Sequence, residues 1–201
     1  MRILYFDLET KYSADDVGGW GHIDEMGMSV GVLWDSRDQK FHVYLEHQIR
    51  QLISHLKQGD LIVGFNHVEF DHRVLSGCEP AGEARQRLYL ELVSLNNFDM
   101  LTEVKKILGH RLKLDSIARP TLQAGKSADG LQALQWYKEG KMDLIIEYCK
   151  QDVEVTRQIH EFALKQGHLF YESRSGVRQV DLDWNLTPPQ PPVMEQMSLF
   201  D

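Results

Sequence analysis

Carboxylates and one phenol occur in three short motifs that could together form a reaction site. Asp7 and Glu9 lie two residues apart near the end of an alternating, strand-like run, so their side chains share one face. Asp71 follows a short apolar run, where a buried strand gives way to a helix. Tyr148 and Asp152 are four residues apart in a long helical pattern and therefore lie on the same helix face.

Each motif alone also has an ordinary explanation. Two acids at a strand end occur by chance in many chains, an acid in the first turn of a helix is favoured by the helix dipole, and an i,i+4 pair can lie on a surface. The apolar residues Ile145, Cys149 and Val153 argue against the last explanation, because they indicate that this part of the long helix packs inward.

Taken together, the four acids indicate a metal site. Carboxylates gathered in a partly desolvated cleft repel one another strongly, so such a group needs bound cations. Because the ligands are Asp and Glu oxygens with no Cys or His pattern, we expect Mg²⁺ or Mn²⁺. Two divalent ions would balance the four acids, and two such ions suit the in-line attack of water on a phosphodiester.

The order and spacing of the motifs resemble those of a known nuclease family. Residues 6–10 (Phe-Asp-Leu-Glu-Thr), 66–71 (Asn-x3-Phe-Asp) and 148–152 (Tyr-x3-Asp) are similar to the three motifs of the DEDDy branch of the RNase H-like 3′–5′ exonucleases. The likeness covers about residues 1–165. It is greatest to the proofreading domain of family-B DNA polymerases and to small stand-alone bacterial relatives of that domain.

This resemblance implies a role for each motif residue. Tyr148 would orient the attacking water, and a phenol with a reference pKa of about 10 suits a positioning group better than a strong base. The histidine branch of the superfamily has a His five residues before the last Asp, where this chain has Glu147, which favours the tyrosine branch. The metal ligands implied by the resemblance are Asp7, Glu9, Asp71 and Asp152.

Substrate contacts are less well defined by the sequence. The candidates are Asn66, Trp20, Lys126 and Arg111, and for each an ordinary role as a packed aromatic or a solvated polar group stays open. His67 and His72 flank the second motif, and we expect them to be polar residues of the cleft rather than metal ligands, because the carboxylate set is complete.

The elements that must position these motifs form a mixed pattern. Helices are predicted over 46–58, 69–77, 99–109 with Asp99 as N-cap, from 115–116 to before Pro120, and 142–165 with Gly167 ending the last one. Three strands followed by helices interleaved with a strand predict an α/β fold, which the resemblance makes an RNase H-like mixed sheet flanked by helices. Strands are predicted over 2–7, 28–35, 40–45, 61–65, 168–172 and 177–183.

The C-terminal residues have a different composition. Four of the six prolines lie at positions 188, 189, 191 and 192, so we expect a domain over 1–184 and an extended tail over 185–201. The tail ends in Leu199 and Phe200, apolar anchors that suit insertion into a groove on another protein, although they could also pack on this domain.

The last apolar segment also resembles a known docking peptide. Gln196, Met197, Ser198, Leu199 and Phe200 are similar to the pentapeptide that binds the bacterial sliding clamp, with Met in place of the usual Leu. This resemblance implies the bacterial β sliding clamp as a partner, a role in DNA repair or end processing, and a place in the cytoplasm near the nucleoid.

Composition sets the broad class. The 201 residues, 42% of them hydrophobic, suit one globular domain, and the absence of a long apolar run argues against a membrane span. Asp7 argues against an N-terminal signal segment. Cys78 and Cys149, with no CxxC spacing, indicate a reducing cytosol.

The charge bears directly on the substrate. With 22 Lys and Arg against 30 Asp and Glu, the net charge is −8, so a broad basic face for nucleic acid is not expected. The favoured interpretation is a DNA exonuclease that acts on single-stranded 3′ ends and is delivered by the clamp. An exoribonuclease stays open, because contacts to the 2′-OH would discriminate the sugar. A catalytically silent, clamp-tethered binding protein also stays open, although the complete acid set argues against it.

Overall fold

A five-stranded mixed sheet forms the centre of the protein. The computed structural model describes residues 1–123 and 130–184. The strand order is β3-β2-β1-β4-β5, in which β2 is antiparallel to β1 and β3, while β4 is parallel to β1 and β5. The strands are β1 (Ile3–Thr10), β2 (Met28–Asp35), β3 (Lys40–Leu45), β4 (Leu61–Gly64) and β5 (Asn97–Asp99).

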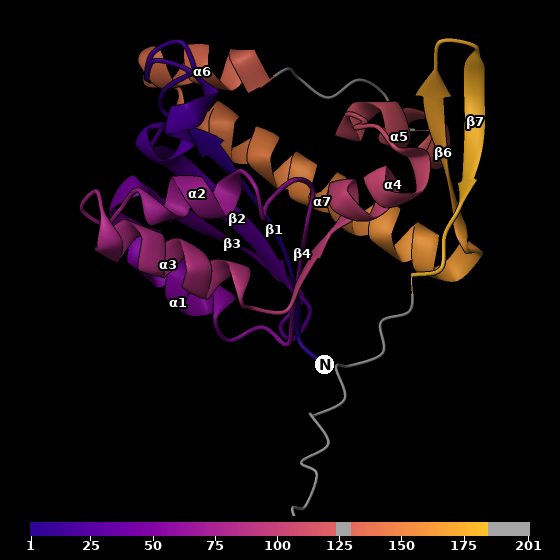
Figure 1. Ribbon diagram of the computed structural model, residues 1–201, viewed down its shortest axis with the longest axis horizontal. Helices are drawn as coiled ribbons and strands as arrows, with labels where there is room; N and C mark the ends of the chain where they lie inside the picture. Colours follow the sequence, from indigo (N-terminus) through magenta and orange to yellow (C-terminus); the bar gives the residue numbers. More distant parts are fainter. Residues whose placement is uncertain (124–129, 185–201) are drawn as a thin grey trace, which may run out of the picture.

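Helices cover both faces of this sheet (Figure 1). One face packs against α1 (Ile49–Leu56), α2 (Asp71–Ser76) and α3 (Glu83–Val93). The other packs against α4 (Met100–Leu108), α5 (Leu114–Leu122), α6 (Gly130–Lys138) and the long α7 (Met142–Gln166). Two short 3₁₀ helices, η1 (Trp20–Glu25) and η2 (Glu46–Gln48), and a hairpin of β6 (His168–Ser173) and β7 (Gly176–Asp181) complete the described fold. Of the helices in the described ranges, none has the length and apolar character needed to cross a membrane.

The alternation of side chains along β1 determines where its acids emerge. Leu4, Phe6 and Leu8 pack into the core beneath α1 and α2, whereas Tyr5 packs into the core beneath α7. Because side chains two residues apart share a face, Asp7 and Glu9 lie on the α7 side of the sheet. The strand therefore directs both carboxylates toward the longest helix of the fold.

Most of the predicted elements are confirmed, and the α/β class with them. Strands β2 and β3 have the predicted bounds, and Asp99 caps α4 by accepting a hydrogen bond from the Thr102 N–H at 3.2 Å. Four of the described elements were not predicted: η1 is a short 3₁₀ helix, β5 is three residues long, α3 buries only Leu92, and α6 lies where no pattern was recognised.

The predicted end of the helix before Pro120 is wrong. Pro120 lies inside α5, which continues to Leu122. The last turn is held from outside: the Thr121 hydroxyl donates to the Phe170 carbonyl at 2.9 Å and accepts from the Phe170 N–H at 3.1 Å. These contacts to β6 offset the single helix hydrogen bond that a proline cannot make.

Gly77 allows α2 to approach η1 closely. A Cβ at this position would collide with the backbone carbonyl oxygen of Asp24, so no larger residue fits without movement of the backbone. The close approach places η1, and Trp20 at its start, beside the helix that carries Asp71.

Candidate active site

Three carboxylates from two distant parts of the chain converge at the end of β1. Asp7, Glu9 and Asp152 each offer an oxygen, and these oxygens lie within 4.8 Å of one another. The Cys149 side chain of α7 joins the two elements, because its Sγ lies 3.5 Å from the Asp7 carbonyl oxygen and 3.6 Å from the Asp7 Oδ2. The thiol is thus positioned to donate a weak hydrogen bond to the acid.

Asp71 lies beside this group at the start of α2. Its Oδ1 accepts a hydrogen bond from the Leu8 N–H at 3.1 Å, and the side chain is buried. This bond ties the first turn of α2 to β1 between the two acids of the strand. The structure therefore brings together the residues of all three motifs.

The electrostatics of the group favour a bound cation over four uncompensated charges. Burial, and then the charges of Asp71, Asp152 and Glu9, raise the pKa of Asp7 well above its ordinary value, and burial likewise raises that of Glu9. Burial raises the pKa of Asp71 to about 8 and that of Asp152 to about 7. In the described part of the chain, no Lys or Arg forms an ion pair with these four acids. A set of carboxylate oxygens without a positive partner fits a hard divalent cation.

Tyr148 lies one helical turn before Asp152 and hydrogen-bonds to it. The ring is almost buried and meets Trp136 edge-on, with 6.3 Å between the ring centroids. Burial and the neighbouring acids raise the pKa of this phenol still further above its ordinary value, so it stays protonated at neutral pH. Glu147, by contrast, is exposed and pairs with Lys150 at 2.7 Å.

The backbone of the second motif is held by a carboxylate that the sequence analysis assigned only to a helix cap. Asp99, at the end of β5, accepts from the Asn66 N–H at 2.9 Å and from the Val68 N–H at 3.1 Å. Asn66 has a φ of +68°, in the left-handed region that few non-glycine residues adopt. The short strand thus fixes the unusual conformation of the loop between β4 and α2.

His67 and His72 are not cleft residues, so that prediction is wrong. Both side chains are fully buried, and their Nε2 atoms share the Oδ1 atom of Asn97 at 3.1 and 2.9 Å. Burial lowers the pKa of His67 to about 4 and that of His72 to about 3, so both rings are neutral. Asn97 in turn donates to carbonyl oxygens at the end of α3. The pair therefore belongs to the packing behind the second motif.

A cavity of about 460 Å³ opens in front of Asp7, Glu9 and Asp71. Its lining also includes apolar and aromatic side chains, among them Trp20, which is 72% exposed and lies 6.5 Å from Phe70 between ring centroids. Asn66 also lines the cavity, so two of the predicted substrate contacts face it. Lys126 and the docking peptide 196–200 lie outside the described residues.

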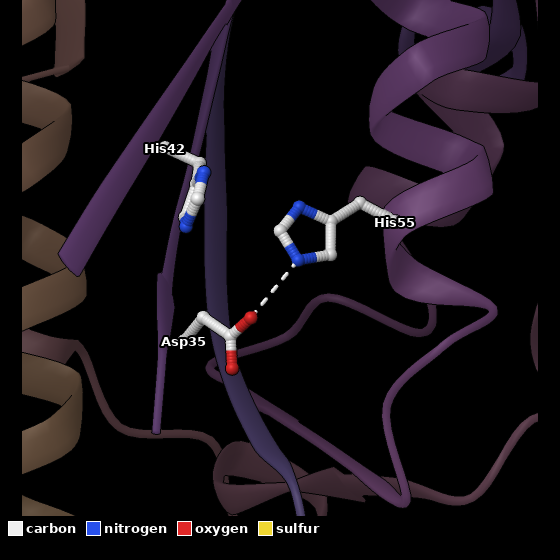
Figure 2. A group of neighbouring side chains, drawn as sticks. All are labelled: Asp35, His42 and His55. Carbon is white, nitrogen blue, oxygen red and sulfur yellow. Dashed lines mark hydrogen bonds and ion pairs between the residues drawn. The ribbon is translucent and has the colours of Figure 1, made fainter. Parts of the chain in front are cut away.

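A second group of metal-type side chains lies elsewhere and already has a cation. Asp35, His42 and His55 come from β2, β3 and α1 and approach one another closely (Figure 2). The Arg2 guanidinium donates to the Asp35 Oδ2 at 2.5 Å and to the His55 Nε2 at 2.7 Å. Because this guanidinium uses the lone pairs that a metal would need, the group is a buried ion-pair network rather than a metal site.

Comparisons with known proteins agree with the fold of the chain. A model of the RNase H superfamily matches residues 4–164. Among solved structures, the chain is similar to the family B DNA polymerase from the hyperthermophilic archaeon Pyrobaculum calidifontis, with 19% sequence identity and a TM-score of 0.59. The likeness covers 82% of this chain and 24% of the polymerase, so it is evidence for the fold alone. No curated protein sequence matches the chain.

Proposed function

The chain belongs to the RNase H superfamily, and from that membership we propose that it is a metal-dependent 3′–5′ exonuclease of the DEDDy type that acts on DNA. The observation that carries the proposal is the convergence of Asp7, Glu9 and Asp152 within 4.8 Å, with Asp71 beside them. One buried and three partly buried acids that have no positive partner among the described residues are costly for a fold that has no use for them.

The four carboxylates would hold two Mg²⁺ or Mn²⁺ ions, and their all-oxygen donor set fits either metal. When bound, these ions supply the activation of water and the neutralisation of phosphate charge that phosphodiester hydrolysis needs. Asp152 accepts the Tyr148 hydrogen bond, which leaves the phenol oxygen free to accept one from the attacking water. Since the phenol stays protonated, its role is to orient that water.

The cavity suits a nucleotide at the end of a single strand. Trp20 and Phe70 offer aromatic surface on which a base can stack, and Asn66 offers an amide at the edge of the acidic group. Lys126 remains a predicted contact to the backbone of the strand. These assignments place the reacting phosphate at the acids and the last base against the apolar part of the cavity.

Cleavage of end-labelled single strands tests the enzymatic part of the proposal. With Mn²⁺, the wild-type chain should shorten a 5′-labelled DNA strand stepwise from its 3′ end, and Asp7→Asn or Asp152→Asn should abolish the products. Asp143→Asn, an exposed acid in the first turn of the same α7, is the matched control and should cut normally. If a matched RNA strand is cut in preference to DNA, RNA is the substrate instead. If neither strand gives a product, the proposed nuclease activity is rejected.

We also propose that residues 196–200 recruit the enzyme to the bacterial β sliding clamp for DNA repair or end processing. Tethering raises the local concentration of an acidic enzyme near DNA, which its own charge disfavours. Removal of Leu199 and Phe200 should abolish binding to immobilised clamp and leave the cleavage of free oligonucleotides unchanged. Full clamp binding by the truncated chain would reject this assignment.

A further inference from the structure

The cavity in front of the acids has no positively charged side chain among the lining residues that the structure describes. Its described lining consists of acidic, apolar and uncharged polar side chains, with no Lys or Arg among them. A nucleic acid strand carries one negative charge per nucleotide, so entry into this cavity brings phosphates toward carboxylates. Metal ions can compensate the charge of the scissile phosphate, but the neighbouring phosphates of the strand need a positive partner elsewhere.

Arg111 provides a cation at the edge of this cavity. Its Nη2 donates to the Oδ1 of Asn66 at 2.7 Å, and Asn66 lines the cavity beside Asp71. Arg111 is exposed and follows Gly109, whose left-handed conformation ends α4, while the next residue, Leu112, packs against the core. The backbone on both sides of Arg111 is therefore held by the fold, while its guanidinium stays open to solvent.

The bond between the two residues fixes which atoms remain available. A guanidinium can only donate hydrogen bonds, so the Asn66 oxygen must be the acceptor and the Asn66 amide NH₂ is left to point elsewhere. The pair thus presents N–H donors beside a group of carboxylates that can only accept. Phosphate oxygens are acceptors, so this edge of the cavity matches the backbone of a nucleic acid strand.

The backbone keeps this pair in place before any ligand binds. Asp99 accepts a hydrogen bond from the Asn66 N–H and so holds Asn66 in its left-handed conformation. Asp99 also caps α4, the helix that leads to Arg111. One carboxylate of β5 therefore positions both partners, Asn66 directly and Arg111 through α4. Such preorganisation reduces the entropy cost of ordering an arginine around a phosphate.

We propose that Arg111, oriented by Asn66, is a phosphate clamp that binds a non-scissile phosphate of the strand whose end lies at the acids. This inference rests on the proposed function for the direction of the strand. The contact between Arg111 and the phosphate, however, affects the affinity for the strand and not the chemical step, so binding measurements test it separately. The clamp recognises the backbone and not the sugar, so it serves DNA and RNA alike.

Binding measurements on the full-length chain test whether Arg111 contacts a phosphate. The probe is a fluorescein-labelled oligothymidine, with Ca²⁺ in place of Mn²⁺ to limit cleavage, and the readout is fluorescence anisotropy. Arg111→Ala should weaken binding about tenfold and make the negative slope of log K against log salt shallower by about 0.7, the value for one phosphate contact in a single strand. Arg111→Lys should restore the salt slope and only part of the affinity. The matched control Arg87→Ala removes an exposed arginine of α3 and should change neither quantity.

Neutral backbone linkages separate a direct contact from a structural effect. In a set of strands with one methylphosphonate each, wild type should lose affinity at one non-scissile position, and Arg111→Ala should show no further loss there. The assignment of Arg111 as a phosphate-binding residue would be wrong if Arg111→Ala kept the wild-type affinity and salt slope. It would also be wrong if both proteins lost affinity equally at every methylphosphonate position. If the protein binds the strands as expected but never cleaves them, the proposed nuclease activity is rejected and the phosphate contact of Arg111 is still supported.

Discussion

Replacement of Asp152 by Asn should stabilise the metal-free protein while it abolishes metal-dependent activity. Asp152 lies against Asp7 and Glu9, and without bound ions its charge has no positive partner among residues 1–123 and 130–184. Asparagine has nearly the same shape and can still accept the hydrogen bond from Tyr148. The substitution therefore removes charge repulsion and desolvation with little loss of packing.

The magnitude follows from the perturbed acid. The pKa of Asp152 is about 7 in the fold against an ordinary value of 3.8, which at about 1.36 kcal/mol per pKa unit corresponds to about 4 kcal/mol against the ionised form. Relaxation of the site reduces this figure, so we expect a gain of about 2–4 kcal/mol in the free energy of unfolding, or about 5–15 °C in Tm.

The pH dependence of this gain in stability independently tests whether it comes from the charge of Asp152. When folding raises the pKa of a carboxyl group, the ionised group destabilises the folded protein. This destabilisation grows as pH rises from the pKa of the group in the unfolded chain to its pKa in the fold. The advantage of Asp152→Asn should therefore be full at a pH of about 8.5 and small near a pH of about 4, where the wild-type acid is protonated in the fold and close to its ordinary pKa in the unfolded chain. Thermal and urea unfolding in EDTA at these two pH values measure both effects.

Asp35, a buried aspartate of β2, supplies a control of opposite sign. Although burial opposes it, the hydrogen bonds from Arg2 hold the pKa of Asp35 well below its ordinary range. Asp35→Asn should therefore destabilise the protein at alkaline pH, and this loss should diminish as pH falls toward the low pKa. Added Mn²⁺ should raise the Tm of wild type above that of Asp152→Asn. The reasoning fails if Asp152→Asn is no more stable than wild type at high pH in EDTA, or equally stabilised at both pH values.

Three further outcomes follow from contacts in the fold. Gly77→Ala should lower the free energy of unfolding by about 2–4 kcal/mol through the collision with the Asp24 carbonyl, and a wild-type urea midpoint would contradict this. Asp99→Ala frees the loop of the second acidic motif and should reduce kcat by at least about tenfold, as steady-state kinetics would show. Cys149→Ser keeps a donor to Asp7 and should retain more activity than Cys149→Ala, and the reverse order would exclude a role for that hydrogen bond.

The parts of the site that follow a regular period could be predicted from the sequence. The two-residue period of β1 and the four-residue spacing on α7 place Asp7, Glu9 and Asp152 on facing surfaces, and the structure has them there. Asp99 as a helix cap was also predictable, because that role needs only local sequence.

Features that depend on contacts across the fold could not be predicted. The second role of Asp99 requires β5 to pair with β4, and a three-residue strand has too little pattern to be recognised. The burial of His67 and His72 depends on Asn97, some 30 residues away in sequence. In the same way, nothing local indicates that Arg2 fills the space between Asp35 and His55.

The contact between Cys149 and Asp7, 142 residues apart in sequence, also determines when the site can exist during synthesis. A ribosome that adds about 5–20 residues per second needs roughly 7–30 s to go from one to the other. Throughout that interval the nascent chain has the acids of β1 without their partner on α7. The proposed catalytic group is therefore completed only once α7 has been made, so we expect a chain that ends before α7 to lack the proposed nuclease activity.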